Sequence, residues 1–389
     1  MAAAPDIRRL LAEMVARNAS DLYLTAESPP VLRIEGFTEP LGAEKLTPAH
    51  TETLAHALMT ERQRAAFDER LEMNLAIHSE RAGRFRINVF RQRGAIGVVI
   101  RQIRTRIPTI DELGLPPILK QITLNRRGLV LVVGATGSGK STTQAAMIDY
   151  RNEQTLGHIL TIEDPIEFVH QHKRCIITQR EVGFDTISFN DALRNTLRQA
   201  PDVILIGEVR DLETMEAAVT FAETGHLCLA TLHSNNANQA IERVINFFPV
   251  NRHNEIYLQL SLNLCAIVSQ RLVPGIDGKR VAAVEVLMDT PYAKDLIKKG
   301  QIDTLKEAME VSTQEGSQTF DQALFDLCAA GRISEEQALA NADSANNLRI
   351  RLNNLSISRM STQERHSVGL DGRGLRIEAV PGAASGRNR

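Results

Sequence analysis

The chain has 389 residues and a formal net charge of −2, so it is long enough for two domains and has no global attraction to nucleic acid or to an anionic membrane. No apolar run reaches the roughly 18 residues that a membrane helix needs, and charged residues interrupt the first turns where a signal peptide would be apolar. The cysteines form no C-x-x-C pair and are expected to be reduced, as in a cytoplasmic protein: Cys175, Cys228, Cys265 and Cys328. Any membrane association is therefore expected to go through a partner, without direct membrane insertion.

The first 105 residues predict a small α+β domain with an antiparallel sheet. Apolar residues recur at helical spacing in 5–18, and 47–68 is also helical in pattern. In the strand-like runs apolar residues tend to recur at every second position, and turn residues lie at the ends of the runs. They lie at 21–25, 31–34, 72–78, 84–92 and 95–103.

Arginines alternate with apolar residues in the 84–92 run. Arg84 and Arg86 therefore share the exposed face of that strand, and Arg101 lies on the next one. Exposed arginines are usually solvated surface. The alternative is that they cross a subunit boundary and stabilise phosphate charge as arginine fingers.

Residues 106–115 are interpreted as a linker, and from 116 to 350 apolar strands alternate with helical stretches. Such strands are expected in a parallel sheet covered on both faces, the architecture of RecA-like P-loop NTPases. The predicted strands are 129–133, 158–162, 203–206, 226–232 and 280–287. After Pro291 the pattern is mostly helical, and Ser334 with Gln337 forms a capping box. Residues 351–389 are expected to be a disordered tail.

A glycine-rich loop of the form G-x-x-x-x-G-K-S joins the strand at 129–133 to a helix. Its residues are Gly134, Ala135, Thr136, Gly137, Ser138, Gly139, Lys140, Ser141 and Thr142. Glycines let the backbone N–H groups point at phosphate oxygens, the lysine reaches the β- and γ-phosphates, and the Ser141 hydroxyl ligates Mg²⁺. The alternative is a glycine-rich turn with a chance lysine, but the flanking strand and helix favour a site for a nucleoside triphosphate.

Acidic residues end two of the predicted strands. Glu163, Asp164 and Glu167 follow 158–162, and Glu208 follows 203–206 in the form of a Walker B segment. The carboxyl ends of parallel strands face the ligand crevice, so these acids are expected near the γ-phosphate, where Glu208 can hold a Mg²⁺-bound water. A single acid at a strand end is as often a helix cap or a surface residue.

Two histidines flank the strand at 226–232. His226 and His233 are seven residues apart, which puts them on opposite faces by simple alternation. No third soft ligand lies near them, so a metal site is not indicated. From the residues alone, core histidines with satisfied hydrogen bonds are the default.

These motifs together resemble the secretion ATPases, and in particular the type IV pilus retraction family of PilT and PilU. The resemblance runs from Ala19 to about residue 350. It rests on the P-loop, the acidic box 161–167, the Walker B segment 207–211, the histidine box 226–233 and Ser269-Gln-Arg-Leu272. A four-cysteine zinc motif typical of the assembly ATPases is missing from this sequence. Lys294 and Asp295 differ from the Ile-Arg pair that the retraction motors have in the corresponding helix. Residues 315–324 and 341–349 are most similar to the PilU branch.

The resemblance implies a hexameric ring whose subunits have a PAS-like N-terminal domain and a nucleotide between the two domains. It implies Glu163 as the catalytic glutamate, Glu208 as the Walker B glutamate and His226 and His233 as the histidine box. Arg86 and Arg101 match the arginines that reach ATP. The cofactors are then ATP and Mg²⁺, and the partners are copies of itself or another retraction ATPase, with the inner-membrane pilus platform protein. The expected location is the cytoplasmic base of the pilus machine.

Three functions follow from these features. The leading one is an ATP-hydrolysing motor subunit that supports pilus retraction and twitching motility as an accessory to a primary motor. A primary PilT-type motor is the alternative form of this function, and the runner-up is a nucleotide-binding ring subunit with little turnover. A DNA-translocating motor is a distant third, because the chain has a near-neutral charge and no basic, aromatic-rich stripe.

Overall fold

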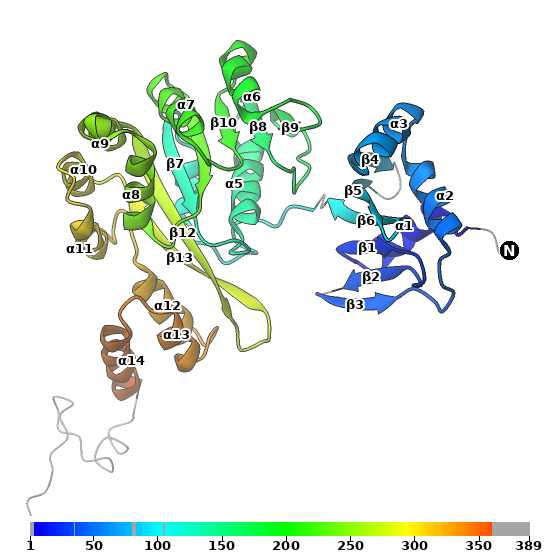
Figure 1. Cartoon of the computed structure of the whole chain (residues 1–389). Helices are drawn as coiled ribbons and strands as arrows, with labels where there is room; N and C mark the ends of the chain where they lie inside the picture. Colours follow the sequence, from blue (N-terminus) through cyan, green and yellow to red (C-terminus); the bar gives the residue numbers. More distant parts are fainter. Residues whose placement is uncertain (1–3, 35, 80–82, 104–105, 360–389) are drawn as a thin grey trace, which may run out of the picture. The chain divides into compact units, whose positions relative to one another are not determined.

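The structure, a computed structural model, describes residues 4–34, 36–79, 83–103 and 106–359. The described strands form two sheets (Figure 1). The chain divides into two compact units, one of Met1–Pro108 with Asn152–Pro201 and the other of Thr109–Arg151 with Asp202–Arg389. The division predicted from the sequence, at 105 and 116, stays a prediction.

The N-terminal sheet is six-stranded and antiparallel. Its strands are β1 (Asp21–Leu24), β2 (Val31–Ile34), β3 (Phe37–Pro40), β4 (Glu72–Ser79), β5 (Gly83–Gln92) and β6 (Ala95–Ile103), in the order β3-β2-β1-β6-β5-β4. The α+β prediction for this region is confirmed, and β3 is an addition to it. In β5 the burial alternates as predicted, with Phe85, Ile87 and Val89 buried and the arginines on the other face.

Three helices accompany this sheet: α1 (Ile7–Ala16), α2 (Pro48–Leu58) and α3 (Glu61–Arg70). The prediction of a single helix over 47–68 is therefore wrong in one respect. The helix is interrupted at Met59, where the backbone is extended. Thr60 begins α3 with a capping box in which its side chain accepts from Gln63 N–H and Gln63 bonds back. Leu54, Leu58 and Phe67 join the apolar core on the sheet.

The second sheet is seven-stranded and mostly parallel. Its strands are β7 (Gly128–Val133), β8 (Gly157–Glu163), β9 (Cys175–Glu181), β10 (Val203–Ile206), β11 (Leu227–Leu232), β12 (Leu264–Pro274) and β13 (Arg280–Met288), in the order β13-β12-β7-β11-β10-β8-β9. Every residue of β7, β10 and β11 is buried, as expected of parallel strands covered on both faces. The α/β prediction is confirmed, but β9 and β12 were not predicted.

Helices connect these strands and form the C-terminal region. They are α4 (Ile118–Thr123), α5 (Lys140–Gln154), α6 (Phe189–Thr196), α7 (Leu212–Glu223), α8 (Ala237–Phe247), α9 (His253–Asn263), α10 (Pro291–Lys298), α11 (Leu305–Val311), α12 (Phe320–Ala329), α13 (Glu335–Asn341) and α14 (Ala345–Arg359), with short 3₁₀ turns at Leu197–Gln199, Val250–Arg252 and Ile302–Thr304. The helical C-terminal region is confirmed, and Ser334 caps α13 by accepting from Gln337 N–H. Because α14 continues to Arg359, the stretch 351–359 is helical and not part of a tail. The rest of the predicted tail lies outside the described residues.

Arg271 on β12 ties the last helices to the second sheet. Its guanidinium lies 3.8 Å from the centre of the Phe320 ring, donates to Asn341 O at 2.8 Å and pairs with Asp343 at 2.8 Å. These bonds hold the α12–α14 helices against β12, and an apolar cluster shared with β12 and β13 packs them there.

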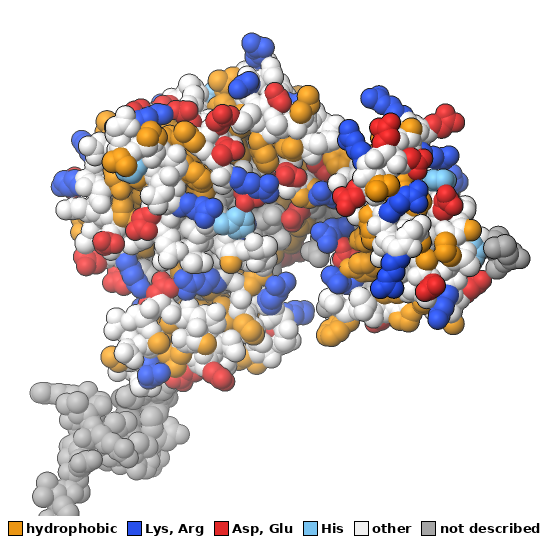
Figure 2. Space-filling view, viewed as in Figure 1, with side chains coloured by type: hydrophobic (Ala, Val, Ile, Leu, Met, Phe, Trp, Pro, Cys, Tyr) orange, Lys and Arg blue, Asp and Glu red, His pale blue; other side chains and the backbone are white. Residues whose placement is uncertain are grey.

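Surface charge is mixed in sign. Figure 2 shows basic and acidic side chains interspersed over the surfaces in view, in line with the net charge of −2. Within the part of the chain that the structure describes, no helix has both the length and the apolar character to cross a membrane.

Candidate functional site

Parallel pairing brings the ends of β7, β10 and β11 level with the middle of β12, which continues to Pro274. Val133, the last residue of β7, pairs with Leu232 of β11 and with Ser269 of β12. Ile206, the last residue of β10, pairs with Ala230. The residues that follow these positions therefore lie together: Gly134 in the loop, His233, Gln270 and, two residues after β10, Glu208.

The glycine-rich loop has the backbone geometry that only glycine adopts freely. Gly134, Gly137 and Gly139 have φ of 153°, 78° and 92°. Lys140 begins α5, and its Nζ donates to Gly134 O at 2.8 Å and to Ala135 O at 3.0 Å. The lysine charge is thus held over the mouth of the loop, the position from which a P-loop lysine reaches phosphate. Ser141 is exposed.

Glu208 is held by two basic side chains. Its Oε1 lies 2.9 Å from His233 Nε2, and its Oε2 accepts from Arg210 Nε at 2.7 Å. Burial raises the pKa of Glu208, whereas the hydrogen bond and the charge of Arg210 lower it. His233 and Lys140 add further positive charge, so the pKa of Glu208 lies below its ordinary value. The carboxylate stays ionised and is available to a cation.

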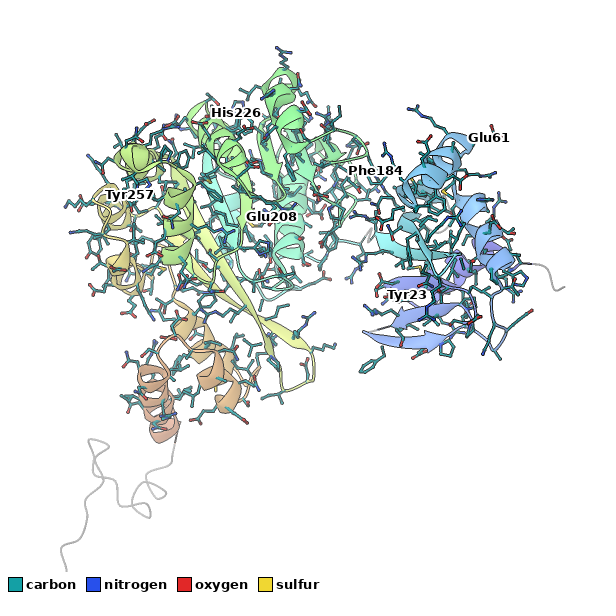
Figure 3. All side chains as sticks on the ribbon, in the orientation of Figure 1. Tyr23, Glu61, Phe184, Glu208, His226 and Tyr257 are labelled. Carbon is teal, nitrogen blue, oxygen red and sulfur yellow. The ribbon has the colours of Figure 1, made fainter. Side chains whose placement is uncertain are left out.

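The structure separates the two predicted histidines. His233 follows β11 and contacts Glu208, whereas His226 precedes β11, at the opposite end of the strand. His226 Nδ1 lies 3.2 Å from Thr224 Oγ1 and 3.3 Å from Phe221 O, near the end of α7. Figure 3 shows Glu208 and His226 at different ends of the strands. Within one chain, only His233 belongs to the loop side of the sheet.

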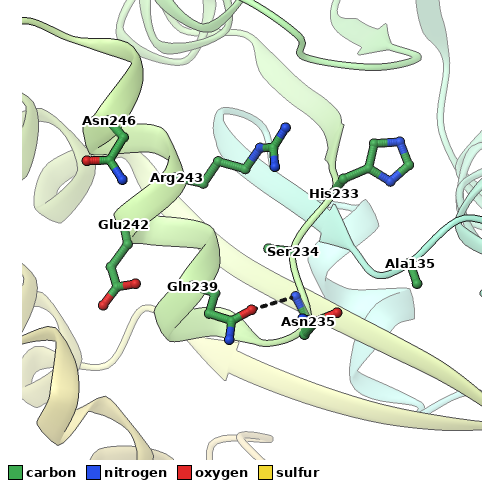
Figure 4. Close-up of a pocket in the computed structure, with 8 residues that line it drawn as sticks. All are labelled: Ala135, His233, Ser234, Asn235, Gln239, Glu242, Arg243 and Asn246. Atoms are coloured by element: carbon green, nitrogen blue, oxygen red, sulfur yellow. Dashed lines mark hydrogen bonds between the residues drawn. The ribbon is translucent and has the colours of Figure 1, made fainter.

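A pocket of about 420 Å³ opens beside the loop (Figure 4). Its lining is mostly polar and comes from the loop, from the segment after β11 and from one face of α8: Ala135, His233, Ser234, Asn235, Gln239, Glu242, Arg243 and Asn246. Asn235 N–H donates to Gln239 Oε1 at 3.2 Å, and Arg243 extends from α8 toward the strand that ends at His233. The pocket extends the site from the loop toward α8.

Glu163 ends β8, in the other compact unit. Its Oε1 accepts from Thr161 Oγ1 at 2.6 Å and from Gln179 Nε2 at 3.2 Å. Burial raises the pKa of Glu163 to about 7 against these two hydrogen bonds, and the nearby negative charges of Glu167 and Glu181 raise it further. A carboxyl with a pKa near neutrality can both accept and release a proton at working pH.

The predicted arginines lie in a cross-strand row on the N-terminal sheet. Arg33 pairs with Asp21, Asp21 with Arg101, and Arg101 with Arg86, so all four share one face. Asp21 is 3% exposed, and its Oδ1 accepts from Arg101 Nε at 2.9 Å. Ser20 Oγ donates to the other carboxylate oxygen at 2.8 Å. One buried carboxylate thus fixes an otherwise exposed Arg101.

Three residues of the site edge were not singled out from the sequence. Arg210 and Gln270 lie inside quoted motifs, Gly207–Asp211 and Ser269–Leu272, but had no assigned role. Glu285 of β13 is 2% exposed and accepts from Ser269 Oγ at 2.9 Å and from Ala237 N–H, at the start of α8, at 2.8 Å. Burial raises the pKa of Glu285 to about 7. The acid fixes the start of α8 next to the pocket, and no local pattern signals it.

The arrangement can bind an anion and support a cation, but it offers no protein metal cage. Among the described residues no group of three or more His, Cys, Asp or Glu side chains could hold a metal ion. Mg²⁺ in proteins keeps waters and is held by one or two protein oxygens together with phosphates. Ser141 and Glu208 are oxygen donors of that kind.

Comparisons with known proteins agree with this fold. Residues 2–365 match the family described as "Type II/IV secretion system protein". The chain is 57% identical over 346 residues to the type IV pilus ATPase PilU of Pseudomonas aeruginosa, spanning 89% of this chain and 91% of that protein. It is 43% identical over 337 residues to the type IV pilus retraction ATPase PilT of the same bacterium, spanning 87% and 98%. A crystal structure of the pilus retraction motor PilT with bound ADP matches with a TM-score of 0.82 at 42% identity, over 87% of this chain and 98% of that one.

Proposed function

This chain belongs to the Type II/IV secretion system protein family, and we propose that it is an ATP-hydrolysing motor subunit that supports retraction of type IV pili and twitching motility. One observation carries the proposal. A glycine-rich loop with Lys140 lies at the same sheet edge as the ionised Glu208 and its partner His233. Phosphoryl transfer depends on positioning and charge, and this edge supplies both.

The loop residues 134–142 bind the triphosphate in this proposal. Backbone N–H groups and the N-terminal end of α5 face the phosphates, and Lys140 contacts the β- and γ-phosphates. The related PilT structure contains bound ADP, which supports a nucleotide as the ligand. When Mg²⁺ is bound, it neutralises phosphate charge. Ser141 and Glu208 are the residues that hold it, and His233 and Arg210 keep the Glu208 carboxylate in place.

Glu163 is the proposed general base. Its pKa of about 7 suits a group that removes a proton from water near neutral pH, and Thr161 and Gln179 fix the orientation of its carboxyl. His226 is proposed to act outside the site of its own chain, because it lies at the far end of β11.

The first prediction separates nucleotide binding from chemistry. Because the base must be deprotonated, kcat/KM should fall as the pH drops through about 7, the pKa of Glu163 in the folded chain. Glu163→Gln should bind ATP as the parent does, lose roughly 100-fold or more in turnover and lose this inflection. Glu167→Gln is the comparison variant: it should keep the turnover, and its inflection should move to lower pH because one negative charge that raises the pKa of Glu163 is removed. Hydrolysis by Glu163→Gln at the parent rate would place the base elsewhere.

The arginine row is proposed to complete the site of a neighbouring subunit. Arg86 and Arg101 stand side by side on one sheet face, and the Asp21 carboxylate fixes the direction of Arg101. Arginine carries a permanent charge in a rigid fork that matches phosphate oxygens. The two side chains would stabilise γ-phosphate charge across the subunit boundary of a ring.

The second prediction tests that boundary. Arg86→Ala and Lys140→Ala subunits should each be nearly inactive alone. Mixed, they should recover part of the activity at interfaces where an intact loop meets an intact arginine. Arg62, exposed on α3 of the same domain, gives the control, since Arg62→Ala should keep parent activity alone. If mixed rings form, as seen by mass spectrometry, and no ratio recovers activity, the arginines do not act in trans.

The proposed role in the cell is that of an accessory motor of the PilU type. Its ring consists of copies of itself or is mixed with another retraction ATPase, and it docks on the pilus platform protein at the cytoplasmic face of the inner membrane. The loop side of the site is intact, while α10 carries the departure at Lys294 and Asp295. These two side chains form surface ion pairs, with Asp289 at 2.8 Å and with Lys299 at 2.6 Å. An intact ATP site with a changed helix supports an accessory over a primary motor.

In this proposal the subunit comprises a PAS-like domain (1–105) and an ATPase region (116–350).

The third prediction tests this role. Deleting the gene should impair twitching or leave extra surface pili, and its effect should require the primary motor. The decisive strain lacks all other pilus retraction ATPases and expresses this chain alone. Retraction of its pili is followed by fluorescence microscopy. We expect little retraction in that strain. Robust retraction would make the chain a primary motor, and normal retraction by a Glu163→Gln chain alongside the primary motor would favour a ring subunit with little turnover.

A further inference from the structure

Gln270 lies under the glycine-rich loop although it is 130 residues away from Lys140. It is the residue after Ser269, which pairs with Val133, so it stands beside Gly134 at the sheet edge. Its side chain is 4% exposed. A buried amide at this position has to be hydrogen-bonded or it destabilises the fold.

The partner of Gln270 is on the helix that follows the loop. Thr143 Oγ1 donates to Gln270 Oε1 at 2.7 Å, and Thr143 is 1% exposed. Thr143 N–H also donates to Gly139 O at 3.0 Å, within the first turn of α5. The hydrogen bond therefore links β12 directly to the turn that carries Lys140.

Gln270 also touches both glycines that define the motif. A Cβ at Gly134 would lie 2.5 Å from Gln270 O, and a Cβ at Gly139 would lie 2.8 Å from Gln270 Nε2. Gln270 O is a backbone atom, so Gly134 is required by this close approach as well as by its positive φ. At Gly139 a Cβ would displace the Gln270 amide from its position.

We propose that Gln270 is a positioning residue for nucleotide binding, which holds the glycine-rich loop in its phosphate-binding shape through Thr143 and through contact with Gly134 and Gly139. The inference rests on the proposed function, because it concerns the same nucleotide. Gln270 itself contacts no nucleotide in this proposal. A purely structural pair would stabilise the fold and leave the affinity for ATP unchanged, so the two roles can be separated.

The test uses the full chain and five variants. Gln270→Met keeps length and packing but removes the acceptor, Thr143→Val removes the donor, and the double variant removes both. Thr143→Ser keeps the hydroxyl and is the conservative rescue. Thr196→Val is the matched control, because Thr196 is also buried in a helix and its hydroxyl bonds only to Ala192 O in the same helix. The affinity for Mg-ATP is measured by titration calorimetry, and Tm is measured without nucleotide.

Gln270→Met and Thr143→Val should each bind Mg-ATP about three- to tenfold more weakly, the scale of one buried hydrogen bond. Thr143→Ser and Thr196→Val should bind as the parent does. In the double variant no buried polar group is left unpaired, so Tm should recover toward the parent value while ATP affinity stays low. If Gln270→Met does not fold, Thr143→Val tests the same bond from the other side.

Parent-like ATP affinity in both Gln270→Met and Thr143→Val would overturn the inference and leave the proposed function intact. So would a double variant in which Tm and affinity recover together, since that is the behaviour of a packing pair. A parent chain that binds no ATP would overturn the proposed function and this inference with it.

Discussion

The register of β7 with its two parallel neighbours is the constraint on which the site depends. Because Val133 pairs with Leu232 and with Ser269, the ends of β7 and β11 lie level with Ser269 and Gln270 in β12. The loop, His233 and Gln270 are adjacent for that reason alone. A shift of one residue in either pairing would turn His233 or Gln270 to the other face of the sheet. The unbroken apolar strands that fix this register are thus the foundation of the site.

The two acids that follow strands β8 and β10 have opposite environments. Arg210, His233 and Lys140 keep Glu208 ionised, whereas burial and neighbouring acids bring the pKa of Glu163 to about 7. Carboxyls whose pKa values are driven apart are suited to different tasks. A carboxyl whose pKa is lowered suits a cation, and a carboxyl that titrates near neutrality suits proton transfer. The electrostatics thus support the division of roles between Glu208 and Glu163.

Much of this fold could be predicted from local patterns, and the failures have physical causes. The apolar runs of β7, β10 and β11 and the glycine-rich loop are contiguous signals. β12 was missed because polar Ser269, Gln270 and Arg271 interrupt its apolar run, and each is bonded to a group far away in sequence: Glu285, Thr143 and Asp343. The break between α2 and α3 depends on one capping threonine. His226 and His233 are separated because the whole of β11 lies between them. The alternation of side chains along a strand predicts the face on which each lies, but not where the strand begins and ends.

The nucleotide affinity of the Lys140→Ala chain tests the central claim most directly. Lys140 is held at the mouth of the loop by Gly134 O and Ala135 O, so its removal should cost a charge-assisted contact of about 1.5–3 kcal/mol. Titration calorimetry with Mg-ATP should show a loss of about tenfold or more. Lys299→Ala, which removes an exposed lysine on the surface, should show none. Unchanged ATP affinity in Lys140→Ala would contradict the assignment of the loop as the nucleotide site.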